Sequence, residues 1–241
     1  MAHVEHVEAQ PAGSAWAALV PMVRGLVCGG IGFAIGAGIA ALLRVANGHS
    51  AWSLELSFVV GYAFGLPGWL AGVGVWETWA GEWIGRRVKT EGVQGWQRYF
   101  AFTTDHKVIG VQYLVTFLVL FMLAGLMAKL IRAQLQKPEQ SLLSDDMYNR
   151  VMSLHGIIMV AVAVASVIGG FGNYFVPILI GAKDVAFPRL FALTFWLVPP
   201  VAVLLLAAQA VGGWDSGWTA YPPLSVRNAS GSRPHRRVAR P

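Results

Sequence analysis

Long apolar runs separated by short polar stretches dominate the pattern of this chain. A helix needs about 20 mostly apolar residues to cross the hydrocarbon core of a bilayer. Five segments approach or reach that length, and they are residues 25–43, 56–76, 108–131, 151–172 or a little beyond, and 190–211. Tryptophans gather near several segment ends, as interfacial anchors do. The pattern predicts an all-α fold, a multi-pass transmembrane helical bundle of about five spans.

Composition points to an integral membrane protein. Of the 241 residues, 56% are hydrophobic and only 12% are charged, whereas ordinary globular domains have about 25% charged residues. The formal charge of +6 comes mostly from residues 227–241, which hold five arginines and no acidic residue. Residues 1–226 hold 13 basic and 12 acidic residues. The charge therefore does not indicate a nucleic-acid partner.

The single cysteine and the N-terminal stretch exclude two further classes. Cys28 has no second cysteine to pair with, which excludes an internal disulfide and a CxxC motif. The first apolar segment follows a mixed stretch with Glu5 and Glu8, and no clear small-residue cleavage site comes after it. We therefore expect this segment to be a retained span and not a cleaved signal.

Basic residues between the second and third segments predict the orientation. The densest basic cluster outside the tail lies there and consists of Arg86, Arg87, Lys89, Arg98 and Lys107. Because basic loops stay in the cytoplasm, the N-terminus and the loop GAKDVAFPR are predicted inside and the loop 132–150 outside.

The tail, residues 227–241, changes character abruptly. It has no periodicity and is rich in Arg, Ser, Pro and Ala, which predicts disorder. Its five arginines would lie outside, against the positive-inside rule. The stretch is similar to out-of-frame translation of a GC-rich coding sequence, which suggests a frameshift and an interrupted protein.

His155 is the one ionisable residue of the fourth segment, in the motif SLHGIIM. A histidine on an apolar helix face is commonly a core residue bonded to a neighbouring helix, and spacing alone gives that interpretation equal weight. Ionisable residues in a membrane are also functional candidates, and neutral imidazole is an axial ligand of haem iron. Gly156 would leave room for a flat macrocycle. Met152 and Met159 would lie on the same face, either as soft packing for that ring or, as the pattern favours, as ordinary core residues.

Three further polar residues lie where spans end. Arg132, in KLIRAQL, falls at a depth similar to that of His155. Its guanidinium either holds a polar substituent of a ring or extends to lipid headgroups. Asn173 and Asp184 mark the inner turn between the fourth and fifth segments, and they are either ordinary turn residues or the start of a water-filled proton path.

Residues 98–226 resemble the start of subunit I of the haem–copper cytochrome oxidases. The matching stretches follow the order and spacing of that family, and they are TTDHKVIGVQYL, LIRAQL, LLSDDMYN, SLHGIIM, GGFGNYFVPILIGAKDVAFPR, FWLVPP and GWTAYPPLS. The resemblance implies that residues 98–226 supply the first three core helices, incomplete relative to the roughly twelve-helix family core. Residues 1–97 are then an N-terminal extension with two transmembrane helices, and residues 227–241 are a disordered basic tail.

The same resemblance implies roles for the four polar residues. His155 matches an axial ligand of the iron of the low-spin haem, and Arg132 matches the arginine at the haem periphery. Asp184 matches the entrance of the cytoplasmic proton channel, and Asn173 matches a residue that lines this channel. Phe191 stands where many relatives have asparagine, which implies a channel that is narrowed, rerouted or unused.

The resemblance also implies an activity. In a terminal respiratory oxidase of the bacterial plasma membrane, subunit I works with subunits II and III. It passes electrons from cytochrome c through haem to a haem–copper centre and reduces dioxygen to water with proton translocation. The second haem ligand and the copper ligands have no match in this chain, so we expect the isolated chain to be inactive. Two alternatives stay open: a quinol oxidase subunit I fragment, and a non-catalytic haem-binding or assembly protein of the bilayer.

Overall fold

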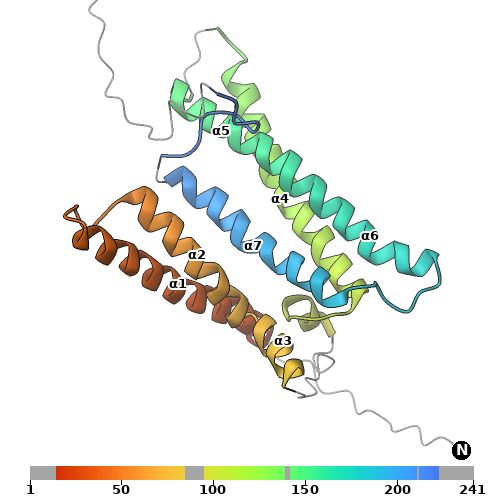
Figure 1. The fold of residues 1–241 in the computed structure, drawn as a ribbon. Helices are drawn as coiled ribbons and strands as arrows, with labels where there is room; N and C mark the ends of the chain where they lie inside the picture. Colours follow the sequence, from red (N-terminus) through yellow and green to blue (C-terminus); the bar gives the residue numbers. More distant parts are fainter. Residues whose placement is uncertain (1–14, 85–94, 139–141, 211, 223–241) are drawn as a thin grey trace, which may run out of the picture. The chain divides into compact units, whose positions relative to one another are not determined.

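The structure is a computed structural model, and it describes residues 15–84, 95–138, 142–210 and 212–222. This part of the chain is helical and contains no β-strand (Figure 1). Five stretches of it are long and apolar enough to cross a membrane: Leu19–Ala46, Leu54–Gly72, His106–Gln134, Asp145–Leu179 and Pro188–Gln209. The prediction of an all-α fold with five spans is confirmed. The basic residues at 86, 87 and 89 and the tail 227–241 lie outside the described residues.

Large apolar side chains stay exposed along these spans. Leu42, Val119 and Ile168 are 72%, 63% and 67% exposed in the chain taken by itself. Apolar surface of this extent is unfavourable in water, whereas bilayer lipid or neighbouring membrane helices would cover it. Together with the five apolar helices, this surface identifies an integral membrane protein.

The helices belong to two compact units. The first unit comprises Met1–Gln112 and Asn173–Pro200, and the second comprises Tyr113–Gly172 and Val201–Pro241. The first therefore contains α1 (Ala15–Ala46), α2 (Leu54–Gly72) and α3 (Val75–Trp83). The second contains α5 (Asp145–Ile157), most of α4 (His106–Gln134) and the first half of α6 (Ala165–Leu179).

Glycines bring α1 and α2, which lie side by side in Figure 1, into backbone contact. The glycines recur with the same spacing in both helices, at Gly25, Gly29, Gly32 and Gly36 and at Gly61, Gly65, Gly68 and Gly72. A Cβ atom added to Gly36 would lie 2.4 Å from the carbonyl oxygen of Val60, and one added to Gly68 would lie 2.4 Å from that of Cys28. Only glycine therefore fits there, as at many interfaces between membrane helices.

A break separates α2 from α3. The hydroxyl of Ser53 caps the start of α2. Beyond its end, Gly74 has a φ of +94°, in the left-handed region that favours glycine. The prediction of one span over residues 56–76 is therefore wrong at its end. Trp76 belongs to α3, and its indole N–H donates to the carbonyl oxygen of Pro67 at 3.0 Å.

The fourth span combines α5, a π-helical segment (Ile158–Val164) and α6. The hydroxyl oxygen of Ser144 caps α5 by accepting the backbone N–H of Met147. Asp145 and Asp146 occupy the first turn, where negative charge complements the helix dipole. The span therefore begins before the predicted residue 151, because a capped polar turn precedes the apolar run.

In the first unit, α2 contacts the early part of α7 (Pro188–Ala210) through two tryptophans. The indole N–H of Trp69 donates to the carbonyl oxygen of Trp196 at 2.9 Å, and the two ring centroids are 6.3 Å apart. Both residues are buried. Because a buried indole N–H needs an acceptor, this bond holds the N-terminal helices against α7.

Candidate functional site

His155 lies about three turns into α5, in the second unit. Its Nδ1 is 2.9 Å from the carbonyl oxygen of Ala124 in α4. A carbonyl oxygen only accepts hydrogen bonds, so Nδ1 carries the proton of the neutral imidazole and Nε2 keeps its lone pair. Histidine ligands of metals are commonly oriented by such a bond from the other ring nitrogen. The geometry leaves Nε2 of His155 as the nitrogen that can bind a metal.

His155 and Arg132 line the same cleft. The cleft has a volume of about 880 Å³, which falls in the range of cofactor sites, roughly 300–1,000 Å³. Its lining residues come from the last turns of α4, the residues after it and the middle of α5, and they are Ala128, Lys129, Ile131, Arg132, Ala133, Leu135, Gln136, Met152 and His155. The structure thus brings together two residues that the sequence only placed at similar depth.

Lys129 also lines this cleft, and it is not among the site residues predicted from the sequence. It precedes Arg132 by three positions, so the two side chains lie on one face of α4. Neither forms an ion pair among the described residues. The signal that could have revealed Lys129 is its spacing in KLIR, two basic residues one turn apart at the end of an apolar helix.

Gly156 has a different neighbour from the flat macrocycle that the sequence suggested. A Cβ atom added to Gly156 would lie 3.2 Å from both Cβ and Cδ1 of Trp218. The indole of Trp218 therefore fills the space beside this glycine. The preceding residue, Gly217, donates its N–H to the hydroxyl of Ser153 at 3.0 Å, and Ser153 donates to the carbonyl oxygen of Asn149 at 2.8 Å. These bonds hold the segment with Trp218 against α5.

The two methionines near His155 lie in different helical segments. Met152 lines the cleft. Met159 lies in the π-helical segment Ile158–Val164, where i→i+5 bonding shifts the side chains out of the α-helical register, and it is not among the residues that line the cleft. The predicted packing of Met152 and Met159 on one face stays a prediction.

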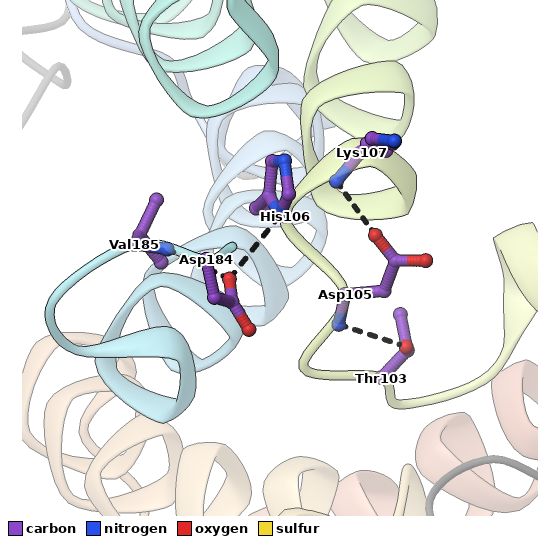
Figure 2. Close-up of polar contacts among 6 residues, drawn as sticks. All are labelled: Thr103, Asp105, His106, Lys107, Asp184 and Val185. Carbon is purple, nitrogen blue, oxygen red and sulfur yellow. Dashed lines mark hydrogen bonds and ion pairs between the residues drawn. The ribbon is translucent and has the colours of Figure 1, made fainter. Parts of the chain in front are cut away.

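A second polar group lies in the first unit, at the start of α4. The Nδ1 of His106 is 3.2 Å from Oδ1 of Asp184, and a dashed line joins them in Figure 2. The same carboxylate oxygen accepts the backbone N–H of Val185 at 2.8 Å. The His106 side chain is 7% exposed and that of Asp184 is 42% exposed. The carboxylate of Asp184 thus contacts both solvent and a buried imidazole.

The residues TTDHK hold His106 in this position. The carboxylate of Asp105 accepts the backbone N–H of Lys107 at 2.8 Å, and the N–H of Asp105 donates to the hydroxyl of Thr103 at 3.2 Å (Figure 2). These contacts cap α4. Nothing in the linear pattern of the sequence relates His106 to Asp184.

Asn173 is buried in α6, and Phe191 is 37% exposed near the start of α7. Both belong to the unit that contains Asp184. A buried amide needs polar partners, so the buried environment of Asn173 argues against an ordinary solvated turn residue. The roles of Asn173 and Asp184 in proton transfer, and the effect of Phe191, stay predictions.

The fold and these polar groups define a multi-span helical membrane protein with ionisable side chains near the ends of its helices. Residues 108–237, more than half of the chain, match the family described as cytochrome c and quinol oxidase polypeptide I. The chain belongs to this family. The match begins after the two N-terminal spans and includes part of the tail, residues 227–241.

Individual relatives agree with this assignment. The cytochrome c oxidase subunit 1 of Thermostichus vulcanus is 51% identical over 136 residues, which cover 56% of this chain and 25% of that protein. The corresponding protein of Synechocystis sp. is 45% identical over 131 residues, covering 54% and 24%. The heme-copper oxidase subunit I+III of Aeropyrum pernix is 40% identical over 141 residues, covering 58% and 17%. The chain thus spans about a quarter of the length of the first two relatives.

Proposed function

We propose that this chain is part of the catalytic subunit I of a terminal respiratory oxidase and that His155 is an axial ligand of its low-spin haem. The oxidase carries electrons from cytochrome c through haem to a haem–copper centre and reduces dioxygen to water with proton translocation. Its location is the bacterial plasma membrane, and its partners are subunits II and III. Family membership and the names of the relatives support this proposal.

The observation that carries the proposal is the hydrogen bond between Nδ1 of His155 and the carbonyl oxygen of Ala124. In the neutral imidazole it places the proton on Nδ1, leaves Nε2 as the ligand nitrogen and holds the plane of the ring. A histidine that only packs in the core could make the same hydrogen bond to a neighbouring helix, but it would not need a cleft beside it. Here a cofactor-sized cleft lies at the same side chain.

The residues of the cleft fit a haem. One imidazole provides a ligand for iron, apolar side chains such as Ile131 and Leu135 provide contacts for the ring, and Arg132 provides charge-assisted hydrogen bonds for an acidic substituent. A bound haem supplies a one-electron redox centre. In this chain His155 would ligate the iron, the carbonyl oxygen of Ala124 would orient the imidazole, and Arg132 would neutralise an acidic substituent of the ring.

The pair His106 and Asp184 supports the proton-transfer part of the proposal. The half-exposed carboxylate of Asp184 can take a proton from solvent, and the imidazole 3.2 Å away holds that carboxylate toward the protein interior. Asn173, buried in the same unit, would hydrogen-bond water along the path. The side chain of Phe191 would narrow this proton path.

A reduced-minus-oxidised difference spectrum of the purified chain, loaded with haem in lipid nanodiscs, tests the proposal. We expect a haem signal that His155→Ala abolishes, because the substitution removes the ligand nitrogen. Added free imidazole should restore part of the signal. His106→Ala is the matched control, since His106 lies outside the cleft, and it should leave the spectrum unchanged. The same signal in wild type and His155→Ala would reject the ligand assignment.

A further inference from the structure

A second cleft, in the first unit, adjoins the pair of His106 and Asp184. It has a volume of about 450 Å³ and is lined by Trp79 of α3, by Thr104 and by residues 186–190. Thr104 precedes His106 by two positions, and the last segment begins two positions after Asp184. Because Nδ1 of His106 lies 3.2 Å from Oδ1 of Asp184, the two segments that carry this pair also form walls of the cleft.

The walls of this cleft suit water. The hydroxyl of Thr104 and the guanidinium of Arg189 are polar, and both residues belong to the lining. Phe187 and Leu190 are 67% and 51% exposed, so the cleft reaches the surface. A space of this size with polar groups in its wall can hold several water molecules. Such water would adjoin the half-exposed carboxylate of Asp184.

Trp79 is the part of the wall that comes from the N-terminal extension, residues 1–97. Its ring packs edge-on against that of Trp76, with the centroids 6.2 Å apart. The indole N–H of Trp76 donates to the carbonyl oxygen of Pro67, whereas that of Trp79 is buried and has no acceptor in the described part of the chain. A buried N–H without an acceptor is unfavourable, so packing alone holds the Trp79 ring, and rotation toward water would satisfy its N–H.

An ordinary interfacial anchor is the competing interpretation of Trp79, because tryptophans gather where membrane helices meet water. Trp52 has the arrangement expected of an anchor. It is 63% exposed, precedes the start of α2 and does not line the cleft. Trp79, by contrast, is only partly exposed and forms a wall of the cleft. The chain thus offers its own comparison between a tryptophan of the cleft and a tryptophan of the surface.

We propose that this cleft is a water-filled vestibule of Asp184 and that Trp79 restricts the access of water to it. The indole narrows the vestibule where it lies in the wall, and its rotation widens the path to the carboxylate. The inference rests on the proposed function only for its consequence, the control of proton uptake at Asp184. It adds a positioning residue, Trp79, that lies outside the family match of residues 108–237.

The test measures access to Asp184 directly, in the full chain in nanodiscs. A water-soluble carbodiimide with glycinamide converts accessible carboxylates to amides, and peptide mass spectrometry follows the rate at each site. We expect Trp79→Ala to speed the labelling of Asp184 several-fold, because loss of the indole widens the vestibule. Ala186→Phe adds a ring to another wall and should slow it. Asp145, exposed in the first turn of α5 in the second unit, is the internal reference.

Trp52→Ala is the matched control, and Asp184 should be labelled in it at the wild-type rate. An unchanged rate in Trp79→Ala would overturn the proposal and favour an ordinary anchor. Faster labelling of Asp184 and Asp145 together would mean that the variant had loosened the chain. Ala186→Phe then decides, since an unchanged rate at Asp184 in that variant would overturn the vestibule.

Proton uptake by the assembled oxidase separates this proposal from the proposed function. Unchanged uptake in Asp184→Asn would reject the role of Asp184 in proton transfer. The labelling rates in Trp79→Ala and Ala186→Phe do not depend on that role, so they would still report whether Trp79 restricts access to the carboxylate.

Discussion

The Nδ1 of His106 and the Oδ1 of Asp184 lie 3.2 Å apart, although one residue begins α4 and the other lies in the turn before α7. Consecutive spans alternate in direction, so the start of α4 and the start of α7 belong to the same side of the membrane. The charge distribution of the sequence predicts that this side is cytoplasmic. A buried imidazole beside a half-exposed carboxylate suits the entrance of a proton path.

Asp184→Asn should slow proton uptake in the assembled oxidase. The amide keeps the size of the side chain and a hydrogen bond to His106, but it cannot carry a proton. We expect a loss of roughly tenfold or more, since positioned acid–base groups contribute about 10²–10⁴-fold. The measurement is the rate of proton uptake by proteoliposomes after a pulse of reduced cytochrome c.

Glu55→Gln is the control for this experiment. Glu55 is an exposed carboxylate in the first turn of α2, and it begins a span at the opposite side of the membrane from Asp184. It should leave proton uptake unchanged. An equal decrease in both variants would point to a general effect of lost negative charge and would contradict a specific role of Asp184.

Gly36→Ala should destabilise the first unit by about 1–3 kcal/mol, the usual range for overpacking. The added methyl group would lie 2.4 Å from the carbonyl oxygen of Val60 and 2.9 Å from Cα of Gly61, so α1 and α2 would have to separate. Gly38→Ala is matched in sequence and chemistry, but its methyl group meets nothing within 4 Å. Thermal unfolding in detergent, followed by circular dichroism, compares the variants, and equal midpoints would contradict the observed contact.

Gly156→Leu should release the segment that carries Trp218. A Cβ atom added at position 156 would lie 3.2 Å from Cβ and Cδ1 of Trp218. The longer leucine side chain would therefore occupy the space of the Trp218 indole. Limited chymotrypsin digestion should cut after Trp218 several-fold faster in the variant. Gly172→Leu serves as the control, because its Cβ has open space, and the same cutting rate in both variants would show that Trp218 does not depend on Gly156.

Trp69→Phe should weaken the attachment of α2 to α7. The substitution removes the N–H that donates to Trp196 and leaves a small void, which together should lower the free energy of unfolding by about 2 kcal/mol. Trp52→Phe changes a tryptophan that is 63% exposed and should have little effect. Denaturation by increasing SDS in mixed micelles measures both variants, and indistinguishable curves would argue against the Trp69 bond.

Much of the fold could be predicted from the sequence because membrane spans follow a local rule. The length and apolarity of a segment decide whether it can cross a bilayer, and all five predicted spans occur in the structure. The errors lie at boundaries. The end of the second span depends on the backbone conformation of Gly74, and the start of the fourth depends on the cap at Ser144, neither of which a hydropathy pattern measures.

The motifs of the sequence also indicated the family, since their order and spacing are linear properties. Only the tertiary structure decided which groups each polar side chain contacts. Residues that are far apart in the sequence meet in the hydrogen bond from His155 to Ala124 and in the contact of His106 with Asp184. Two residues of one helix face, Lys129 and Arg132, line the same cleft. Such contacts depend on how helices pack and rotate against each other, whereas a span needs only its own residues to form.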